Sequence, residues 1–361
     1  MKIAVLVSGG VDSSVVVDLL YREGHDLHLF YIRIGNDNGE GDCSAEEDIE
    51  MCTLIARKYN LPLQVVSLHE EYWDSVMEYT LRTVREGLTP HPDMMCNKLV
   101  KFGYFEERWG KDFDKVATGH YASIEAHNGR LYLATATDPV KDQTDFLAQI
   151  SYSQLSHLMF PLGRLPKSEV RRIAAEAGLP TAVRKDSQGI CFLGKINYND
   201  FIERHLGTRP GPIVEIETGR KIGEHRGYWF HTIGQRKGLG LSGGPWYVVR
   251  KNVRDNVVYV SNGYDTRRQY GREIPVEEMH WITTDPFATG SESVQVAFKT
   301  RHTPEFLSGI IIRDSHGGFT VKSDADVQGI APGQYVIIYT PDRRLCLGSG
   351  MISVPVRGKK K

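Results

Sequence analysis

The sequence predicts an α/β protein: a doubly wound, mostly parallel sheet at the N-terminus, then a small central domain and a C-terminal β-barrel. Strand-like and helix-like stretches alternate over residues 1–140, as they do in parallel sheets with crossover helices. Residues 206–270 are rich in glycine, and residues 271–361 contain short strand-like runs at a spacing typical of a small barrel. We therefore expect one domain over residues 1–205, followed by these two.

The composition is that of a globular protein, since 40% of the 361 residues are hydrophobic and 25% are charged. The formal net charge of −1 neither supports nor excludes nucleic-acid binding, because a local basic groove is compatible with it. The chain has no apolar run of about 18 residues, and its N-terminal apolar run reads as a strand rather than a secretory signal. Five cysteines, an odd number, favour a reducing compartment, so we expect a cytoplasmic protein without a membrane span.

The hydrophobic pattern defines the elements of the N-terminal sheet. Residues 3–7 form a continuous apolar run and read as a buried strand, and residues 11–23 carry apolar side chains at helical spacing. A capping box of Ser44 and Glu47 marks the start of the next helix. The further expected elements are strands over residues 27–33, 62–68, 116–118 and 131–134, and helices over residues 44–59 and 70–86.

The rest of the chain is expected to be helical first and then all-β. Residues 145–205 read mainly as helices, and the best-marked helix covers residues 168–177, where a Gly-Leu-Pro stop follows. The expected strands beyond this part cover residues 246–249, 256–260, 293–298, 307–312, 318–321, 334–339 and 346–352.

A glycine turn joins the first strand to the first helix. Residues 8–14 read S-G-G-V-D-S-S, and Gly9 and Gly10 allow a tight turn whose N–H groups approach an anion closely. The helix N-terminus adds N–H donors and the positive end of the helix dipole, and the serines add hydroxyl donors. The turn therefore predicts a phosphate-binding loop that is not a Walker A motif. It resembles the PP-loop of the ATP pyrophosphatases, which implies cleavage of ATP between its α and β phosphates.

Two cysteines lie in segments where a chemical role has to be weighed against packing. Cys96 follows two prolines, and we expect a helix to begin near Asn97, so that the helix N-terminus would favour the Cys96 thiolate. Asp93 is placed to cap that helix or to exchange a proton, while a buried structural cysteine is the alternative for Cys96. Cys191 ends a polar stretch but has apolar neighbours, so a core strand and a functional loop both stay open.

Two further segments can be interpreted from their local sequence. Gly119 ends the fourth expected strand, where glycine permits a close backbone approach to a nucleotide. His120 beside it fits a phosphate contact or a structural histidine. Residues 141–145 alone read as a solvated turn with Thr144 or Asp145 as a helix cap.

Together these segments resemble the tRNA-specific 2-thiouridylases, the MnmA family, along essentially the whole chain. The PP-loop and the two cysteine segments are the most specific parts of this resemblance. The matching strings are the PP-loop at residues 6–13, T-P-x-P-D-x-x-C-N-x-x-x-K-F at 89–102, A-T-G-H-Y-A at 117–122, K-D-Q at 141–143, K-D-S-x-G-I-C-F at 185–192, H-T-I-G-Q-R-K-G-L-G at 231–240, and the closing P-G-Q and C-L-G-S-G.

The resemblance implies a reaction and its residues. ATP, with Mg²⁺, adenylates O2 of the wobble uridine, and a persulfide on Cys191 then attacks C2 of the uracil so that AMP leaves. Cys96 is implied as the second thiol, which frees the sulfur and can end in a disulfide with Cys191, and Asp93 as the general acid/base. The implied ATP site comprises Leu6, Val7, Ser8, Gly9, Gly10, Val11, Asp12, Ser13, Ile32 and Gly119.

The resemblance also implies partners. These are a tRNA with a wobble uridine, of the Lys, Glu or Gln type, and an upstream persulfide donor such as a cysteine desulfurase or a relay protein. The chain departs from the family in having His91 where Asn is frequent and His302 where Tyr is frequent, which affects fine contacts rather than the reaction. The implied contacts are His91, Pro92 and Asp93 with the target base, and Lys141, Asp142, Gln143, Arg301 and His302 with tRNA.

Three alternatives are open from the sequence. Asp93, Cys96 and Cys191 have the chemistry to hold an iron–sulfur cluster that carries the sulfur. Another PP-loop ligase, forming an amide or amidine, would leave both cysteines without a role. An RNA-binding module without catalysis would leave the PP-loop unexplained.

Overall fold

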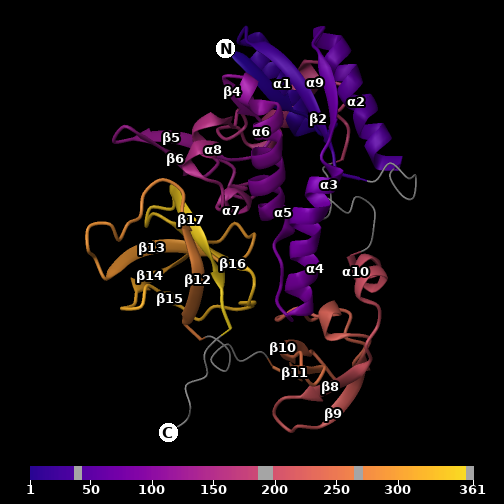
Figure 1. Ribbon diagram of the computed structural model, residues 1–361, viewed down its shortest axis with the longest axis vertical. Helices are drawn as coiled ribbons and strands as arrows, with labels where there is room; N and C mark the ends of the chain where they lie inside the picture. Colours follow the sequence, from indigo (N-terminus) through magenta and orange to yellow (C-terminus); the bar gives the residue numbers. More distant parts are fainter. Residues whose placement is uncertain (36–42, 186–197, 264–270, 355–361) are drawn as a thin grey trace.

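The computed structural model describes residues 1–35, 43–185, 198–263 and 271–354. These residues form three sheets. Figure 1 shows a helix-covered sheet at one end of the molecule, a small sheet at the other end, and a barrel beside the helices that run between them. The expected α/β class, with a small central domain and a C-terminal barrel, is confirmed.

Five parallel strands of the described chain form the N-terminal sheet, in the order β3-β2-β1-β4-β7. The direction of winding reverses between β1 and β4. Ligands of such sheets bind beyond the carboxyl ends of the strands at this point. The strands are β1 (Lys2–Leu6), β2 (Asp26–Arg33), β3 (Leu63–Ser67), β4 (Lys115–Ala117) and β7 (Leu158–Met159).

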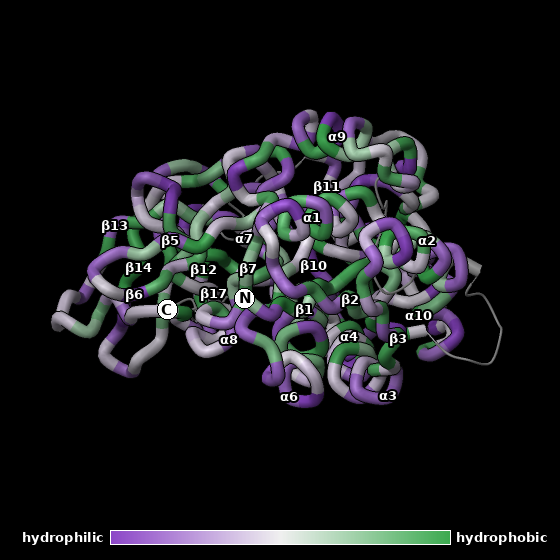
Figure 2. Tube along the Cα trace, turned by 90° about the horizontal axis from the view of Figure 1, so that it is seen from above, coloured by the Kyte–Doolittle hydropathy of each residue, from purple (hydrophilic) through white to green (hydrophobic). Residues whose placement is uncertain are grey.

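Helices cover both faces of this sheet. They are α1 (Val11–Arg22), α2 (Cys43–Tyr59) and α9 (Lys167–Glu176) on one face, and α3 (His69–Tyr72), α4 (Glu78–Arg85) and α6 (Phe105–Arg108) on the other. Figure 2 shows these two layers with the strands between them. Ile3 and Val5 of β1 belong to one core, and Ala4 and Leu6 to the other. A strand buried on both sides is apolar throughout, which is why its sequence is a continuous apolar run.

Two long helical rods lie on the second face. In the first, which confirms the helix expected over residues 70–86, α3 and α4 are joined by a π-helical turn over Trp73–Met77. In the second, α5 (Pro92–Met95) continues through a π-helical stretch over Cys96–Tyr104 into α6. Such π turns are frequent at functional sites. The other helices of the described residues are α7 (Thr144–Leu147), α8 (Tyr152–His157) and α10 (Tyr198–Leu206).

One strand that we expected in the parallel sheet belongs to the barrel sheet instead. The run over residues 131–134 lies in β6 (Arg130–Ala134), which pairs antiparallel with β5 (Ser123–His127). Asn128 and Gly129 join the two strands with positive φ angles of 49° and 74°. An Asn-Gly pair favours a tight antiparallel hairpin, so the chain returns at once instead of crossing over. The edge position in the parallel sheet is taken by β7, in a segment that we expected to be helical.

The central sheet has the order β10-β11-β8-β9, in which β11 and β8 are parallel. The barrel closes because β12 pairs with both β15 and β17. The expected strands are present in both sheets, whereas β8, β9 and β12 were not anticipated. The bounds are β8 (Gly211–Glu215), β9 (Lys221–His225), β10 (Tyr247–Asn252), β11 (Val257–Ser261), β12 (Glu273–Trp281), β13 (Ser293–Lys299), β14 (Leu307–Arg313), β15 (Phe319–Ser323), β16 (Tyr335–Tyr339) and β17 (Leu345–Ile352).

A buried ion pair fastens the barrel to the N-terminal part of the chain. Lys299 Nζ at the end of β13 lies 3.2 Å from Asp142 Oδ2, and the side chains are 1% and 2% exposed. The Asp142 carboxylate also accepts hydrogen bonds from the Ala136 N–H and the Thr144 hydroxyl. Removing one partner of such a pair costs about 3–5 kcal/mol, because the other charge stays buried. The described part of the chain contains no helix that is both long and apolar enough to span a membrane.

Candidate active site

The PP-loop is the turn between β1 and α1. Gly9 has a φ of +70°, and a Cβ atom there would lie 2.8 Å from the Asp48 backbone of α2. Gly10 is the cap residue of α1, and its carbonyl accepts hydrogen bonds from the Ser13 hydroxyl at 3.2 Å and the Ser14 hydroxyl at 2.9 Å. The loop is therefore held from inside by two serines whose hydroxyls we had expected to face a phosphate. The first N–H groups of α1 stay at its positive end.

Asp12, in the first turn of α1, is bound by two side chains from other parts of the sheet edge. Lys167 Nζ, at the start of α9, lies 2.7 and 2.8 Å from the two Asp12 carboxylate oxygens. The Tyr121 hydroxyl donates to Asp12 Oδ1 at 2.8 Å. The backbone N–H of Tyr121 in turn donates to Gln143 Oε1 at 3.0 Å. A chain of contacts thus leads from the PP-loop to the segment that contains Gln143.

The ends of β2 and β4 lie at the same edge as the PP-loop. Gly119 follows β4, and a Cβ atom there would lie 3.0 Å from the Ser13 backbone nitrogen, so any side chain would crowd the start of α1. Ile32 lies near the end of β2 and is partly buried. Burial lowers the pKa of His120 to about 3, and its Nδ1 lies 2.8 Å from the Thr118 hydroxyl. His120 is therefore neutral at physiological pH, which favours the structural role that we had left open.

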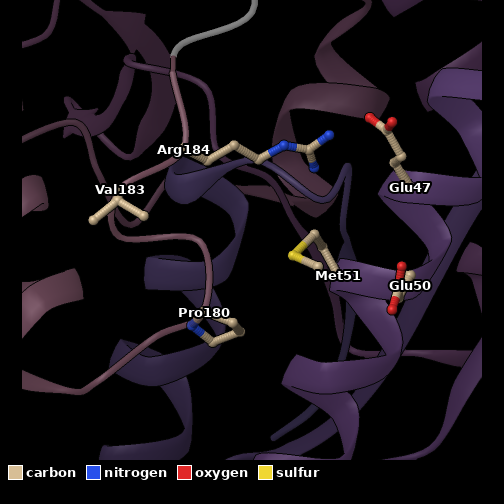
Figure 3. A pocket seen from close by; sticks show the side chains of 6 residues that line it. All are labelled: Glu47, Glu50, Met51, Pro180, Val183 and Arg184. Carbon is tan, nitrogen blue, oxygen red and sulfur yellow. The ribbon is translucent and has the colours of Figure 1, made fainter.

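Arg184 reaches the PP-loop from the other side. Its Nη1 donates to the Gly9 carbonyl at 2.7 Å, and its Nη2 lies 2.6 Å from Asp48 Oδ1. Figure 3 shows Arg184 in a pocket of about 300 Å³ between α2 and the segment before residue 185. The pocket is lined by Glu47, Glu50, Met51, Pro180, Val183 and Arg184.

The segment that carries Asp93 and Cys96 differs from our expectation. The helix begins at Pro92, not near Asn97, because proline is well suited to the first helical position. Cys96 therefore lies in the second turn, where it is 3% exposed, and the argument from the helix N-terminus does not apply to its thiol. Asp93 Oδ1 is buried, and no described residue makes a hydrogen bond to it. A buried carboxylate oxygen of this kind is costly unless a ligand completes its contacts.

Three segments from distant parts of the chain meet beside Asp93. The ring of Phe146 lies 5.6 Å from that of His91 and 4.6 Å from that of His302. His302 Nδ1 lies 2.8 Å from Asp145 Oδ2, which raises the pKa of His302, whereas burial lowers the pKa of His91. Segments 91–93 and 301–302, which the resemblance assigned to RNA, thus both lie beside Phe146, which follows the third assigned segment, 141–143.

The side chains implied to touch tRNA differ in their exposure. The Asp142 carboxylate points inward to Lys299, so its side chain supports the segment from within. Arg301 is exposed, and its guanidinium donates to the Gly329 carbonyl. Lys141 and Gln143 are partly buried. Cys191 lies outside the described residues, so its distance from Cys96 is not part of this geometry.

The barrel holds the segment 89–93 through a clamp that sequence reasoning missed, defined here as Pro332, Gly333 and Gln334. The Thr89 N–H donates to the Pro332 carbonyl at 2.8 Å. Gln334 Nε2 donates to the carbonyls of Thr89 at 3.3 Å and Pro90 at 2.7 Å. Gly333 has a φ of +87°, and a Cβ atom there would lie 2.9 Å from the Thr89 backbone. The Pro-Gly pair signals a turn in the sequence, but its partner lies far away along the chain.

The described residues contain no group of three His, Cys, Asp or Glu side chains that could hold a metal ion. Asp93 and Cys96 alone do not make such a group, and Cys191 lies outside the part of the chain that the structure describes. The fold, the glycine turn and the glycine after β4 define the class: a PP-loop nucleotide-binding domain joined to a small central domain and a β-barrel.

Comparison with known proteins identifies the family. Family models match residues 1–195 (tRNA methyl transferase HUP domain), 199–262 (tRNA methyl transferase PRC-barrel domain) and 271–352 (aminomethyltransferase β-barrel domain). The tRNA-specific 2-thiouridylase MnmA of Porphyromonas gingivalis is 61% identical over 98% of this chain and 99% of its own length. Those of Parabacteroides distasonis and Bacteroides thetaiotaomicron, the latter called MnmA 1, are 62% and 59% identical over 98% of this chain and 99% and 100% of their own lengths. This chain therefore belongs to the tRNA-specific 2-thiouridylase (MnmA) family.

The His302–Asp145 pair yields a prediction about pH. The hydrogen bond with Asp145 stabilises the protonated ring and raises the pKa of His302 above its ordinary value of 6.5, so Asp145→Asn is expected to lower this pKa. The pair adds to stability below pH 6.5, and this contribution is lost as the pH rises through the higher pKa of the folded state. NMR titration of the histidine ring protons measures the pKa directly, with Asp324→Asn on the barrel surface as the control. An unchanged His302 titration in Asp145→Asn would show that the carboxylate does not set this pKa.

Proposed function

We propose that this protein replaces the O2 oxygen of the wobble uridine of tRNA with sulfur, and that ATP activates the uridine for this exchange. One observation carries the proposal. The PP-loop and the segment with Asp93 and Cys96 belong to one connected site, through Asp12, Tyr121 and the segment 141–146. Membership of the 2-thiouridylase family supports the choice of substrate.

The PP-loop suits the phosphates of ATP. Gly9 and Gly10 expose backbone at the N-terminus of α1, where the helix dipole favours negative charge. Mg²⁺ prefers oxygen ligands, and the Asp12 carboxylate at the loop fits it; the ion would neutralise phosphate charge. Ile32 and Gly119, at the ends of β2 and β4, border the same sheet edge, as a nucleotide site at this edge requires.

The first step makes the uridine oxygen a good leaving group. The O2 atom of the uracil forms a bond to the α-phosphorus of ATP, and the bond from that phosphorus to the bridging oxygen breaks. Pyrophosphate leaves with the electron pair, and the N3 proton of the uracil passes to a base. We assign this base to Asp93, because its buried Oδ1 has no hydrogen-bond partner among the described residues. His91 and Pro92 precede it and are placed to contact the same base.

The second step delivers sulfur. The terminal sulfur of a persulfide on Cys191 forms a bond to C2 of the uracil, and the bond from C2 to the adenylated oxygen breaks, so AMP leaves with that oxygen. The Cys96 thiolate then attacks the sulfur of Cys191 and releases the transferred sulfur to the base. The product is 2-thiouridine, and the disulfide between the two cysteines must be reduced by a thiol before the next turnover. An upstream persulfide donor reloads Cys191.

The tRNA is proposed to lie over the junction of the N-terminal part and the barrel. Arg301 and His302 are the exposed groups there, and Lys141 and Gln143 lie on the adjoining segment. Asp142 contributes by holding this segment on Lys299. The division into residues 1–205 for catalysis, and 206–270 and 271–361 for RNA placement, fits this arrangement.

A thiolation assay tests the proposed function. Purified protein, unmodified tRNA with a wobble uridine, Mg-ATP and a sulfur donor are incubated, and the nucleosides are identified by mass spectrometry. Wild type is expected to form 2-thiouridine, and Cys96→Ala and Cys191→Ala are expected to release pyrophosphate without forming it. Cys346→Ala, which also removes a buried thiol, is the matched control and should stay active. If both cysteine variants thiolate at the wild-type rate, the two-thiol chemistry is wrong; if activity instead requires added iron, a cluster replaces the persulfide.

The clamp yields a second prediction. Gln334→Ala removes the amide group that donates to the carbonyls of Thr89 and Pro90, while Asp93 and Cys96 are unchanged. The loss of two hydrogen bonds is worth roughly 1–3 kcal/mol, so we expect about a tenfold lower rate of thiolation at saturating substrates. The affinities for ATP and tRNA should not change, because neither ligand touches Gln334 in this account. Gln295→Ala, on the exposed face of the same barrel, is the control, and an equal loss of affinity and rate in Gln334→Ala would argue against a positioning role.

A further inference from the structure

Lys167 is a cation at the PP-loop to which the reaction described above gives no role. Its ammonium group lies 2.7 and 2.8 Å from the two carboxylate oxygens of Asp12, and its side chain is 15% exposed. It also lies 5.7 Å from the centre of the Tyr121 ring, whose hydroxyl binds the same carboxylate. The lysine is thus at the loop that would bind the phosphates.

Local helix stability does not explain a lysine at this position. Lys167 is the first residue of α9, and a cation at a helix N-terminus is opposed by the helix dipole. Its backbone N–H donates to Asp138 Oδ2 at 2.9 Å, so the local electrostatics favour acidic groups here. The long side chain leaves its own helix and crosses to α1. The contact with Asp12 at the start of α1 therefore accounts for the position of the Lys167 side chain.

The charges around the PP-loop form two matched pairs. Asp12 places a carboxylate where phosphate would bind, and Lys167 neutralises it. On the other side of the loop Asp48 is paired with Arg184, which also donates to the Gly9 carbonyl. Without a nucleotide, each cation is held by a carboxylate. A triphosphate brings negative charge that both cations can bind, and a divalent cation that Asp12 can bind.

We propose that Lys167 is a ligand of the β- and γ-phosphates of ATP and stabilises the pyrophosphate that leaves. The proposal rests on the function proposed above, in that it assumes an ATP that is cleaved between its α and β phosphates. Lys167 moves from Asp12 to the phosphates when Mg-ATP binds, so the ion pair in this structure is the resting arrangement of the site. Lysine suits this exchange, because its ammonium is a compact charge on a flexible stem.

The role in the reaction is electrostatic. As the bond between the α-phosphorus and the bridging oxygen breaks, its electron pair moves onto pyrophosphate, and the negative charge there increases. A fixed cation next to this oxygen stabilises the transition state more than the ground state. No proton needs to leave Lys167, and the lysine is unchanged after pyrophosphate departs.

Binding measurements test the proposal without turnover. The full-length protein, Lys167→Met and Lys167→Arg are titrated by calorimetry with Mg-ATP, with magnesium pyrophosphate and with AMP. A lost hydrogen bond between charged groups predicts about a 10- to 100-fold weaker affinity of Lys167→Met for ATP and pyrophosphate, with AMP affinity within about twofold of wild type. Lys167→Arg should recover much of the loss, since it keeps the charge. Lys221→Met, an exposed lysine of β9 that is also paired with a carboxylate, is the control.

The outcomes separate this proposal from its alternatives. If Lys167 only neutralises Asp12, Lys167→Met weakens AMP, ATP and pyrophosphate by the same factor, and the proposal is wrong. Thermal unfolding of each variant identifies a folding defect. If Lys167→Met is defective, the Lys167→Arg titrations decide: a loss of affinity confined to ATP and pyrophosphate supports the phosphate contact, and equal effects on all three ligands contradict it. If wild type binds pyrophosphate through Lys167 but never thiolates tRNA, the function proposed above fails while the assignment of Lys167 stands.

Discussion

The buried ion pair between Asp142 and Lys299 fixes the geometry on which the site depends. It joins the segment 141–146 to the end of β13, and almost no water reaches either charge. Two connections leave this segment: Gln143 reaches Tyr121 and through it the PP-loop, and Phe146 lies between His91 and His302. A shift of the barrel would therefore disturb both the PP-loop end and the His91 end of the proposed site. Burying the two charges costs desolvation free energy, but the pair holds the barrel at a defined position relative to the segment 141–146.

The barrel also binds the segment that leads to Asp93 and Cys96. Its clamp, Pro332 to Gln334, binds the backbone of Thr89 and Pro90, just before the helix that carries Asp93 and Cys96. The barrel is thus part of the support of the segment to which we assign the catalytic residues Asp93 and Cys96. In the proposed site, the N-terminal part provides the PP-loop and Asp93, and the barrel provides Arg301 and His302.

Local pattern was enough for much of the fold. The apolar run of β1, the glycine turn and α1 were predictable because their sequence signals lie within residues 3–23. The hairpin of β5 and β6 was misassigned, although Asn128 and Gly129 were a readable signal for it. The start of α5 was misplaced because Pro92 was taken as a helix breaker, whereas it is the first helical residue. The partners of Asp12, Asp142 and Thr89 were not predictable, since isolated Lys167, Lys299 and Gln334 look like any surface residue until the fold brings them inward. The site residues themselves came from the resemblance, and the structure adds which of them are neighbours.

The central claim is that O2 of the uridine is adenylated before sulfur replaces it, and an isotope experiment tests it most directly. A tRNA whose wobble uridine carries ¹⁸O at O2 is thiolated, and the AMP and pyrophosphate are analysed by mass spectrometry. Attack of O2 on the α-phosphorus, followed by displacement at C2, predicts one ¹⁸O atom in AMP for each 2-thiouridine formed and none in pyrophosphate. Unlabelled AMP formed together with 2-thiouridine would contradict the account, because the oxygen would then have left the base without passing through ATP.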